Sequence, residues 1–181
     1  MALRHDGDVK TVTVDWQPDE DRFEARGGNA GLLVHMNAPH AEGGPAGFSA
    51  SEMLLAGAGG CSAWDLVEIL RKQRQRVTGI HVEVRGEQAT EPPFAYVRIT
   101  LHYTVSGHHL NETKVRRAVE LSERRYCSVI GTIRGTAAVS CDVYIRESGA
   151  AGPGQLAGSA VAGATSGTAT VETTVTLRAP D

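Results

Sequence analysis

Cysteine is scarce in this chain, with three among 181 residues. Three are too few for a disulfide scaffold, and neither they nor the seven histidines show metal-ligand spacing, so we expect no metal and no cofactor. The formal charge of −3 leaves no basic excess, which argues against a nucleic-acid partner. No apolar run reaches the ~18 residues of a membrane span, and the first thirty residues are too polar for a signal peptide. The sequence therefore predicts a cytoplasmic globular protein without a membrane partner.

The chain is organised around one stretch, residues 49–75, which reads SASEMLLAGAGGCSAWDLVEILRKQRQ. Ser49, followed by Glu52 and an apolar run, is the signature of a helix that begins with a capping box. The first half has almost no polar face, so we expect it to be buried nearly all round. The second half is amphipathic, and Asp65 falls on its polar side. The residues at the apolar spacing are Ala63, Leu66, Val67 and Leu70.

Three glycines, Gly57, Gly59 and Gly60, stand between these halves, directly before Cys61. Each costs about 1 kcal/mol relative to alanine inside a helix. Close approach of another backbone, such as a crossing helix, or a kink would account for them. If the glycines interrupt the helix, Cys61 lies in the first turn of the second half, where unpaired N–H groups and the helix dipole favour a thiolate. The alternative is a small buried hydrophobe, which is what most free cysteines are.

Strands are expected wherever apolar and polar residues alternate, and these ranges are 9–14, 23–26, 31–36, 80–85, 97–105 and 139–145. A second helix follows Asn111 as its N-cap and ends near Cys127, and Ser128 caps a short helix through Ile133. The order βββ-α-ββ-α-β with short connections predicts an α+β fold. We expect an antiparallel sheet with two central helices on one face.

The last part of the chain, residues 148–181, differs from the domain predicted at 1–147. It consists mainly of Gly, Ala, Ser and Thr and has no aromatic residue. Such a segment cannot bury enough apolar area to offset its chain entropy, so we interpret it as a flexible tail. A weak alternation over 168–177 leaves a further strand open as the alternative.

The other two cysteines have different surroundings in the sequence. Cys127 follows Arg124 and Arg125 and precedes the expected helix start at Ser128, an electropositive setting that favours a thiolate. A packed cysteine under a helix end is the alternative. Cys141 falls on the apolar face of the last strand and is predicted to fill the core.

Two runs match a known family, GFSASEMLLAGAGGCSAWDLVEILRKQRQ at 47–75 and ERRYCSV at 123–129. They resemble the OsmC/Ohr family of organic hydroperoxide-reducing proteins, most closely the OsmC-like branch with a PSELLLAALGGC-type helix and a YCSV motif. The resemblance covers about residues 8–147. It implies an intertwined homodimer of two α+β chains, with two thiol sites near the interface.

The resemblance also implies the roles of individual residues. In the family the first cysteine attacks the peroxide and the second resolves the sulfenic acid as a disulfide, and these roles fall on Cys61 and Cys127. The family's glutamate falls on Glu52, which on its own would be only the capping-box partner of a serine. An arginine from the N-terminal hairpin completes the family site. Here Arg22 is the first choice and Arg26 the second.

The expected activity is therefore thiol-dependent reduction of organic hydroperoxides, with an external dithiol, of the lipoyl type in the family, as the reductant. Apolar side chains on the central helix would favour organic hydroperoxides over hydrogen peroxide. Two other classes stay open on the sequence alone. One is a module that binds a small hydrophobic ligand or senses redox state. The other is a thiol enzyme for persulfide or disulfide exchange.

Overall fold

The computed structural model of the chain describes residues 9–27, 33–37 and 47–148. All of the expected tail except Ser148 lies outside these residues. Most of the turn expected at 27–29 and most of the loop expected at 39–47 lie outside them as well. The contacts divide the chain into two compact units, Met1–Leu54 and Leu55–Asp181. Each unit is described by itself below.

The N-terminal unit contains a three-stranded antiparallel sheet in the order β1-β2-β3. β1 (Val12–Gln17) is joined to β2 (Arg22–Gly27) by a short 3-10 turn, η1 (Pro18–Glu20). β3 (Leu33–Met36) pairs with the other edge of β2. The three strands predicted in this region are thus present, although β1 begins at Val12, three residues after the start of the predicted range 9–14.

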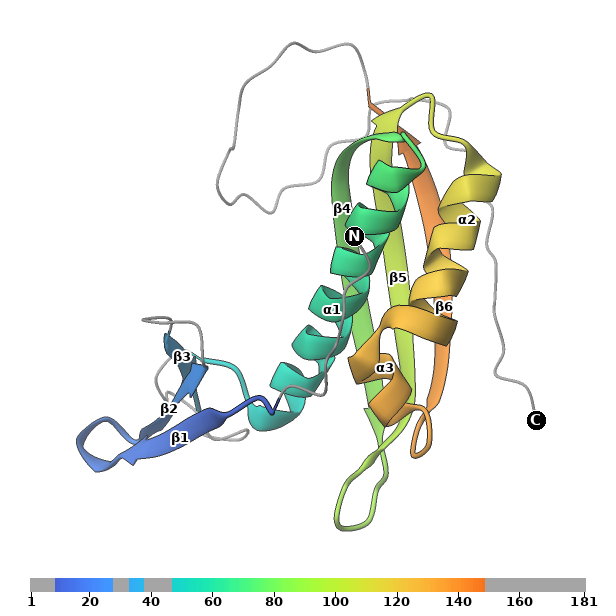
Figure 1. Ribbon diagram of the computed structural model, residues 1–181. Helices are drawn as coiled ribbons and strands as arrows, with labels where there is room; N and C mark the ends of the chain where they lie inside the picture. The colour runs from blue at the N-terminus through green and yellow to red at the C-terminus, as the bar shows by residue number, and fades with distance from the viewer. Residues whose placement is uncertain (1–8, 28–32, 38–46, 149–181) are drawn as a thin grey trace, which may run out of the picture. The chain divides into compact units, whose positions relative to one another are not determined.

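The second unit holds a three-stranded sheet in the order β4-β5-β6. Its strands are β4 (Arg76–Gln88), β5 (Tyr96–His108) and β6 (Ala138–Glu147). β4 and β5 are antiparallel, but β5 and β6 run parallel, so the prediction of an antiparallel sheet is wrong for this pair. The reason is the connection, because a helical crossover carries the chain from the end of β5 back to the start of β6 (Figure 1). The α+β fold class itself is confirmed.

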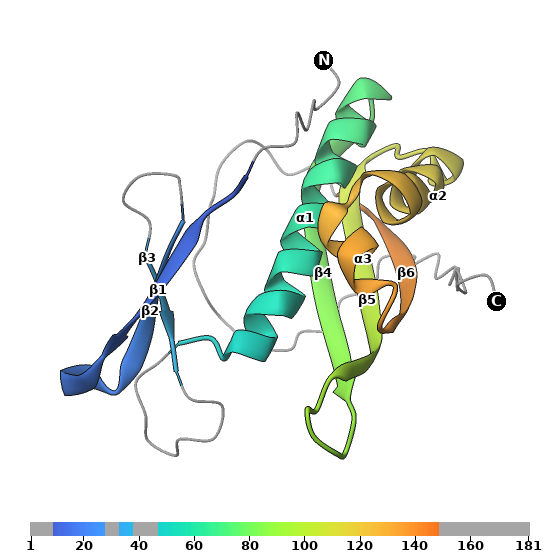
Figure 2. The same ribbon diagram turned by 60° about the horizontal axis from the view of Figure 1, so that its bottom comes forward.

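The helices cover the buried face of this second sheet. On β5, Leu101 and Tyr103 are inaccessible to solvent, whereas His102 between them is only half-buried. α1 (Ala50–Lys72) and α2 (Glu112–Leu121) lie side by side over the buried face (Figures 1 and 2). The helices contribute to the core Ala58, Leu66, Leu70, Val115, Ala118, Val119, Ile130 and Ile133.

α1 runs without interruption through all three glycines. The glycines do not interrupt the helix, so Cys61 lies in the middle of α1 and not in the first turn that an interruption would have given it. The first half of α1 is not buried all round either, since Leu54 is 42% exposed and Gly57 is also exposed. Only one face of this helix packs on the sheet, and within the part of the chain that the structure describes the opposite face of the helix carries exposed residues.

The glycines of α1 do not admit a crossing helix, which corrects a second expectation. A Cβ atom at Gly59 would lie 2.9 Å from Cγ2 of Val84 on β4, so this position needs a glycine because a strand side chain approaches it. At Gly57 and Gly60 a Cβ atom would meet no atom of the described residues within 4 Å. Close approach therefore explains one glycine of the three.

We expect Gly59→Ala to lower the free energy of unfolding by about 1–3 kcal/mol, because the added methyl overlaps the stiff side chain of Val84. Gly57→Ala is the matched control at an open position of the same helix, and it should raise the free energy of unfolding by up to ~1 kcal/mol. Urea unfolding followed by circular dichroism measures both. If Gly57→Ala instead lowers the free energy of unfolding, another part of the protein or a second copy of it covers this position in solution.

By length and composition alone α1 could cross a membrane, although polar residues such as Glu52 and Asp65 interrupt its apolar runs. It is the single such helix in the part of the chain that the structure describes. One helix of this kind is weak evidence, because the core helix of a globular protein passes the same test. Ala58, Leu66 and Leu70 of α1 are completely buried in the protein's own core.

The crossover between β5 and β6 consists of three helical pieces. α2 begins as predicted, since Oδ1 of Asn111 accepts a hydrogen bond from the backbone N–H of Lys114 (3.0 Å). It continues into a single π-helical turn, η2 (Ser122–Tyr126), and then into the short helix α3 (Ser128–Ile133). The π turn lies directly before Cys127 and was not expected from the sequence.

Truncation after Ser148 is expected to leave the melting temperature and the oligomeric state unchanged, because the composition of the tail offers no core. The cut should keep Ser148, whose N–H donates to the carbonyl of Gly107 (2.7 Å) and whose hydroxyl lies 2.6 Å from that of Thr78. Differential scanning calorimetry of the full-length and the truncated chain compares their melting temperatures. A loss of several degrees would mean that residues 168–177 pair with a sheet.

Candidate thiol site

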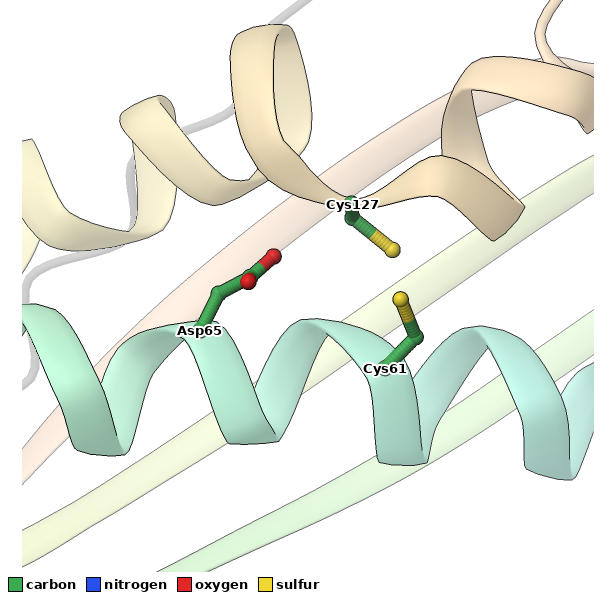
Figure 3. A group of neighbouring side chains, drawn as sticks. All are labelled: Cys61, Asp65 and Cys127. Atoms are coloured by element: carbon green, nitrogen blue, oxygen red, sulfur yellow. The ribbon is translucent and has the colours of Figure 1, made fainter. Parts of the chain in front are cut away.

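Two cysteines from different helices meet in the second unit. Cys61 projects from α1, Cys127 lies between η2 and α3, and their thiols point toward each other (Figure 3). Their Sγ atoms lie within 4.8 Å of one another, and both are free thiols. Cys61 is half-buried, whereas Cys127 is only 4% exposed. The site thus offers one reachable thiol with a buried thiol beside it.

The π turn fixes the position of Cys127. Its N–H donates to the carbonyl of Ser122 (2.8 Å), and its Sγ accepts the N–H of Ile130 (3.5 Å) at the start of α3. The N-cap of α3 is therefore Cys127, not Ser128 as predicted, and the Ser128 hydroxyl instead lies 3.9 Å from Sγ of Cys61. π turns inside helical segments occur frequently at functional sites.

A carboxylate that the sequence pattern placed on the polar face of the helix completes the cluster. Asp65 is 8% exposed, and a carboxylate oxygen lies within 4.8 Å of both sulfurs (Figure 3). The hydroxyl of Ser122 donates to Oδ2 of Asp65 (2.9 Å), which ties η2 to α1. The sequence carried part of this signal, because Cys61 and Asp65 are four positions apart and share one helix face, whereas Cys127 joins them only through folding.

The surroundings of Cys127 are acidic rather than electropositive, which corrects the sequence-based expectation. Burial chiefly, with the neighbouring Cys61 and Asp65, raises the pKa of the Cys127 thiol to about 12. Arg124 and Arg125 precede this cysteine in the sequence, but both side chains are exposed. Cys127 is therefore a protonated thiol at neutral pH.

Glu52 forms the capping box that the sequence predicts. Its Oε2 accepts hydrogen bonds from the backbone N–H (2.8 Å) and the hydroxyl (2.9 Å) of Ser49, whose Oγ in turn accepts the N–H of Glu52 (3.2 Å). These bonds, first of all the one from the Ser49 backbone, hold the pKa of Glu52 below its usual value. Its further role in orienting an arginine stays a prediction.

Arg22 and Arg26 both bind Glu24, which lies between them on β2. Their Nη2 atoms are 3.3 Å and 2.8 Å from the Glu24 carboxylate, and Glu24 is 8% exposed. Among the described residues, no ion pair joins either arginine to Glu52. Glu24 is thus the carboxylate that the two guanidinium groups share, while Arg22 also pairs more closely with Glu20 (2.5 Å). Sequence reasoning missed Glu24 although the three residues alternate on one strand face.

Cys141 fills the core of the second unit, as predicted, and is 1% exposed on β6. Burial raises the pKa of its thiol, and the neighbouring Glu123 raises it further. The Glu123 carboxylate, itself buried, lies beside the Cys141 side chain. Cys141 is therefore occupied in a buried polar contact and is not part of the cluster in Figure 3.

Comparison with known proteins identifies the family. Residues 42–142 match the family model described as OsmC-like protein, and this range contains both cysteine motifs. The chain belongs to the OsmC-like family. Protein YhfA of Escherichia coli K12 is 47% identical to this OsmC-like chain over 81 residues, which are 45% of the chain and 60% of YhfA. The match thus spans less than two thirds of that relative's length.

Solved structures share the fold of this OsmC-like chain. The OsmC-like protein of Mycoplasma pneumoniae has a TM-score of 0.67 at 17% identity, over 77% of this chain and 98% of the other. The organic hydroperoxide resistance protein OhrB of Bacillus subtilis has a TM-score of 0.51 at 16% identity, over 77% and 98%. At these identities the likeness establishes the fold.

In the native protein we expect iodoacetamide to modify Cys61 first, Cys127 more slowly and Cys141 last, because only Cys61 is partly exposed and burial disfavours the other two thiolates. Timed alkylation followed by peptide mapping gives the three rates, with the unfolded chain as the control in which they converge. Modification of Cys141 before Cys61 would contradict the assignment.

Proposed function

We propose that this protein reduces organic hydroperoxides, with Cys61 as the nucleophile and Cys127 as the resolving thiol. The observation that carries the proposal is the convergence of two free thiols, one reachable and one buried, with their Sγ atoms within 4.8 Å. Membership of the OsmC-like family and the fold shared with an organic hydroperoxide resistance protein support the same chemistry.

The reaction proceeds in three steps. The Cys61 thiolate attacks one peroxide oxygen, so that an S–O bond forms, the O–O bond breaks and the alkoxide leaves as the alcohol after taking a proton. The Cys127 sulfur then attacks the Cys61 sulfenic acid and loses its proton, and water departs as the disulfide forms. An external dithiol, of the lipoyl type, reduces the disulfide by thiol exchange and is itself oxidised.

A cation is needed where the alkoxide develops its charge. We propose that a guanidinium of the N-terminal hairpin supplies it, with Arg22 as the first choice and Arg26 as the second. A carboxylate would hold the guanidinium plane, and Glu24 joins Glu52 as a candidate for that role because it already binds both arginines.

We further propose that the protein works as a homodimer in the reducing environment of the cytoplasm. Trp64 is 60% exposed three residues after Cys61, and Tyr126 is 49% exposed directly before Cys127. Large apolar side chains exposed around one site mark a surface that a partner covers. A second copy of the chain is the partner that the family resemblance implies, and light scattering would measure the mass.

The proposed activity is tested by turnover with a dihydrolipoyl-type dithiol and three alternative oxidants. Cumene hydroperoxide should be consumed at least about tenfold faster than hydrogen peroxide, because large apolar side chains, Trp64 and Tyr126, are exposed close to the two cysteines in the chain. A model disulfide should be the poorest oxidant. Preference for the disulfide would instead indicate thiol exchange, and consumption of none of the three would indicate a binding or sensing module.

A further inference from the structure

We propose that Cys61, Asp65 and Cys127 form a binding site for one thiophilic divalent cation, with zinc as the best match. Their ligand atoms lie within 4.8 Å of one another, and the side chains converge from α1 and from the junction of η2 and α3 (Figure 3). Within residues 9–27, 33–37 and 47–148 this is the single group of three His, Cys, Asp or Glu side chains whose ligand atoms lie close enough together to hold one metal ion. Sequence spacing does not reveal the site, because Cys127 reaches it only through folding.

The donor set suits zinc. Two thiolates and one carboxylate form a mainly soft site, whereas magnesium and calcium prefer oxygen ligands alone. Zinc binds sulfur at ~2.3 Å and carboxylate oxygen at ~2.0–2.2 Å, so tetrahedral ligand atoms lie roughly 3.5–3.8 Å apart. Starting from separations within 4.8 Å, each pair of ligand atoms needs to approach by roughly 1.0–1.3 Å at most, which small side-chain rotations allow.

Neighbouring groups already hold two of the ligands. The Ser122 hydroxyl donates to Oδ2 of Asp65 (2.9 Å), and the N–H of Ile130 donates to Sγ of Cys127 (3.5 Å). Outer hydrogen bonds of this kind orient metal ligands and are characteristic of metal sites. Asp65 and Cys127 are buried; a divalent cation would balance the negative charge of the Asp65 carboxylate, and Cys127 would release its proton to the solvent as it binds the ion.

The third ligand leaves the site open on one side. Cys61 is half-buried, and the exposed Ser128 carries its hydroxyl 3.9 Å from Sγ of Cys61. A cation can therefore enter past these residues, and water or the Ser128 hydroxyl can take the fourth position. Metal binding and disulfide formation use the same two sulfur atoms, so the two states exclude each other.

The test is titration of the reduced full-length chain with Co²⁺, because thiolate ligands give cobalt a charge-transfer band in the near ultraviolet. We expect one ion per chain, displaced by Zn²⁺. The intensity of the charge-transfer band should fall by about half, or to zero, in Cys61→Ser and in Cys127→Ser, since each substitution removes one of the two thiolates. Cys141→Ser is the matched control and should keep both the band and the affinity.

Asp65→Asn distinguishes a three-residue site from a simple dithiol. We expect it to keep the band but to bind Co²⁺ on the order of 10–100-fold more weakly, because the amide is a poor ligand. Unchanged affinity would overturn the role of Asp65, and a band that disappears in Cys141→Ser would overturn the site. A wild-type chain without any charge-transfer band would overturn the proposal as a whole.

A second measurement uses only the wild-type chain and so does not depend on how the variants fold. Bound Zn²⁺ should slow alkylation of Cys61 and Cys127 at least tenfold and leave that of Cys141 unchanged; equal slowing of all three would contradict the site. The oxidant diamide should release the ion, because its N=N bond takes two electrons and two protons as the disulfide forms. Retention of the ion in the disulfide form would also overturn the proposal. No peroxide is used, so the metal site and the peroxidase function can fail independently.

Discussion

Serine in place of Cys61 is expected to abolish peroxide-driven oxidation of the protein and to lower turnover of cumene hydroperoxide by at least ~10³-fold. Cys61 supplies the sulfur that attacks the O–O bond, and a hydroxyl at the same position is not ionised at neutral pH. The other thiol close by, Cys127, is protonated and 4% exposed, so it cannot replace the nucleophile. Dithiol consumption measures turnover, and mass spectrometry of the intact chain counts the remaining thiols.

The matched control for this variant is Cys141→Ser. Cys141 is buried on β6 beside Glu123 and is not a member of the thiol cluster, so its replacement should change turnover by less than about twofold. Circular dichroism confirms that both variants fold. If Cys61→Ser keeps full turnover, the peroxidase mechanism is wrong, and the binding or sensing interpretation takes its place.

Serine in place of Cys127 should separate the first chemical step from the second. This variant is expected to consume one equivalent of organic hydroperoxide and then to stop as Cys61 sulfenic acid, because no second thiol is close enough to resolve it. Excess peroxide should then drive Cys61 on to the sulfinic acid. Dimedone labelling detects the sulfenic acid, and a mass increase of two oxygens identifies the sulfinic acid.

The wild-type chain provides the comparison for this second variant. One equivalent of hydroperoxide should join Cys61 to Cys127 within a single chain, since their sulfur atoms already lie within 4.8 Å and belong to helices packed against each other. Peptide mapping without reduction identifies the bond. A disulfide that includes Cys141, or one that joins two copies of the chain, would refute the role assigned to Cys127.

Much of the fold follows from local patterns in the sequence. Alternation predicts each strand, and capping chemistry predicts the start of α1 at Ser49 and of α2 at Asn111. The direction of β6 does not follow, because alternation is the same in parallel and antiparallel strands. Only the long crossover shows that β6 runs parallel to β5.

The sequence predicts which two cysteines form the site, but it does not predict the charges around them. The motifs point to Cys61 and Cys127, and the structure brings the two together. Charge next to Cys127 in the sequence suggested a positive setting, yet side chains of consecutive residues leave a helix in different directions. The pKa of the thiol is raised first by burial and then by Cys61 and by Asp65, which stands sixty-two positions earlier in the chain.

The parallel pairing of β5 with β6 has a consequence for how the protein folds. Its partners are forty positions apart in the chain, as in Thr100 with Ser140, whereas β4 and β5 are neighbours joined by one loop. Contacts between distant residues form slowly, because a large loop must close before they contribute stability. The β4–β5 hairpin is therefore expected to form first and the crossover to dock later. Cys127 travels with that crossover, so during synthesis the thiol of Cys61 exists for a time without its neighbour.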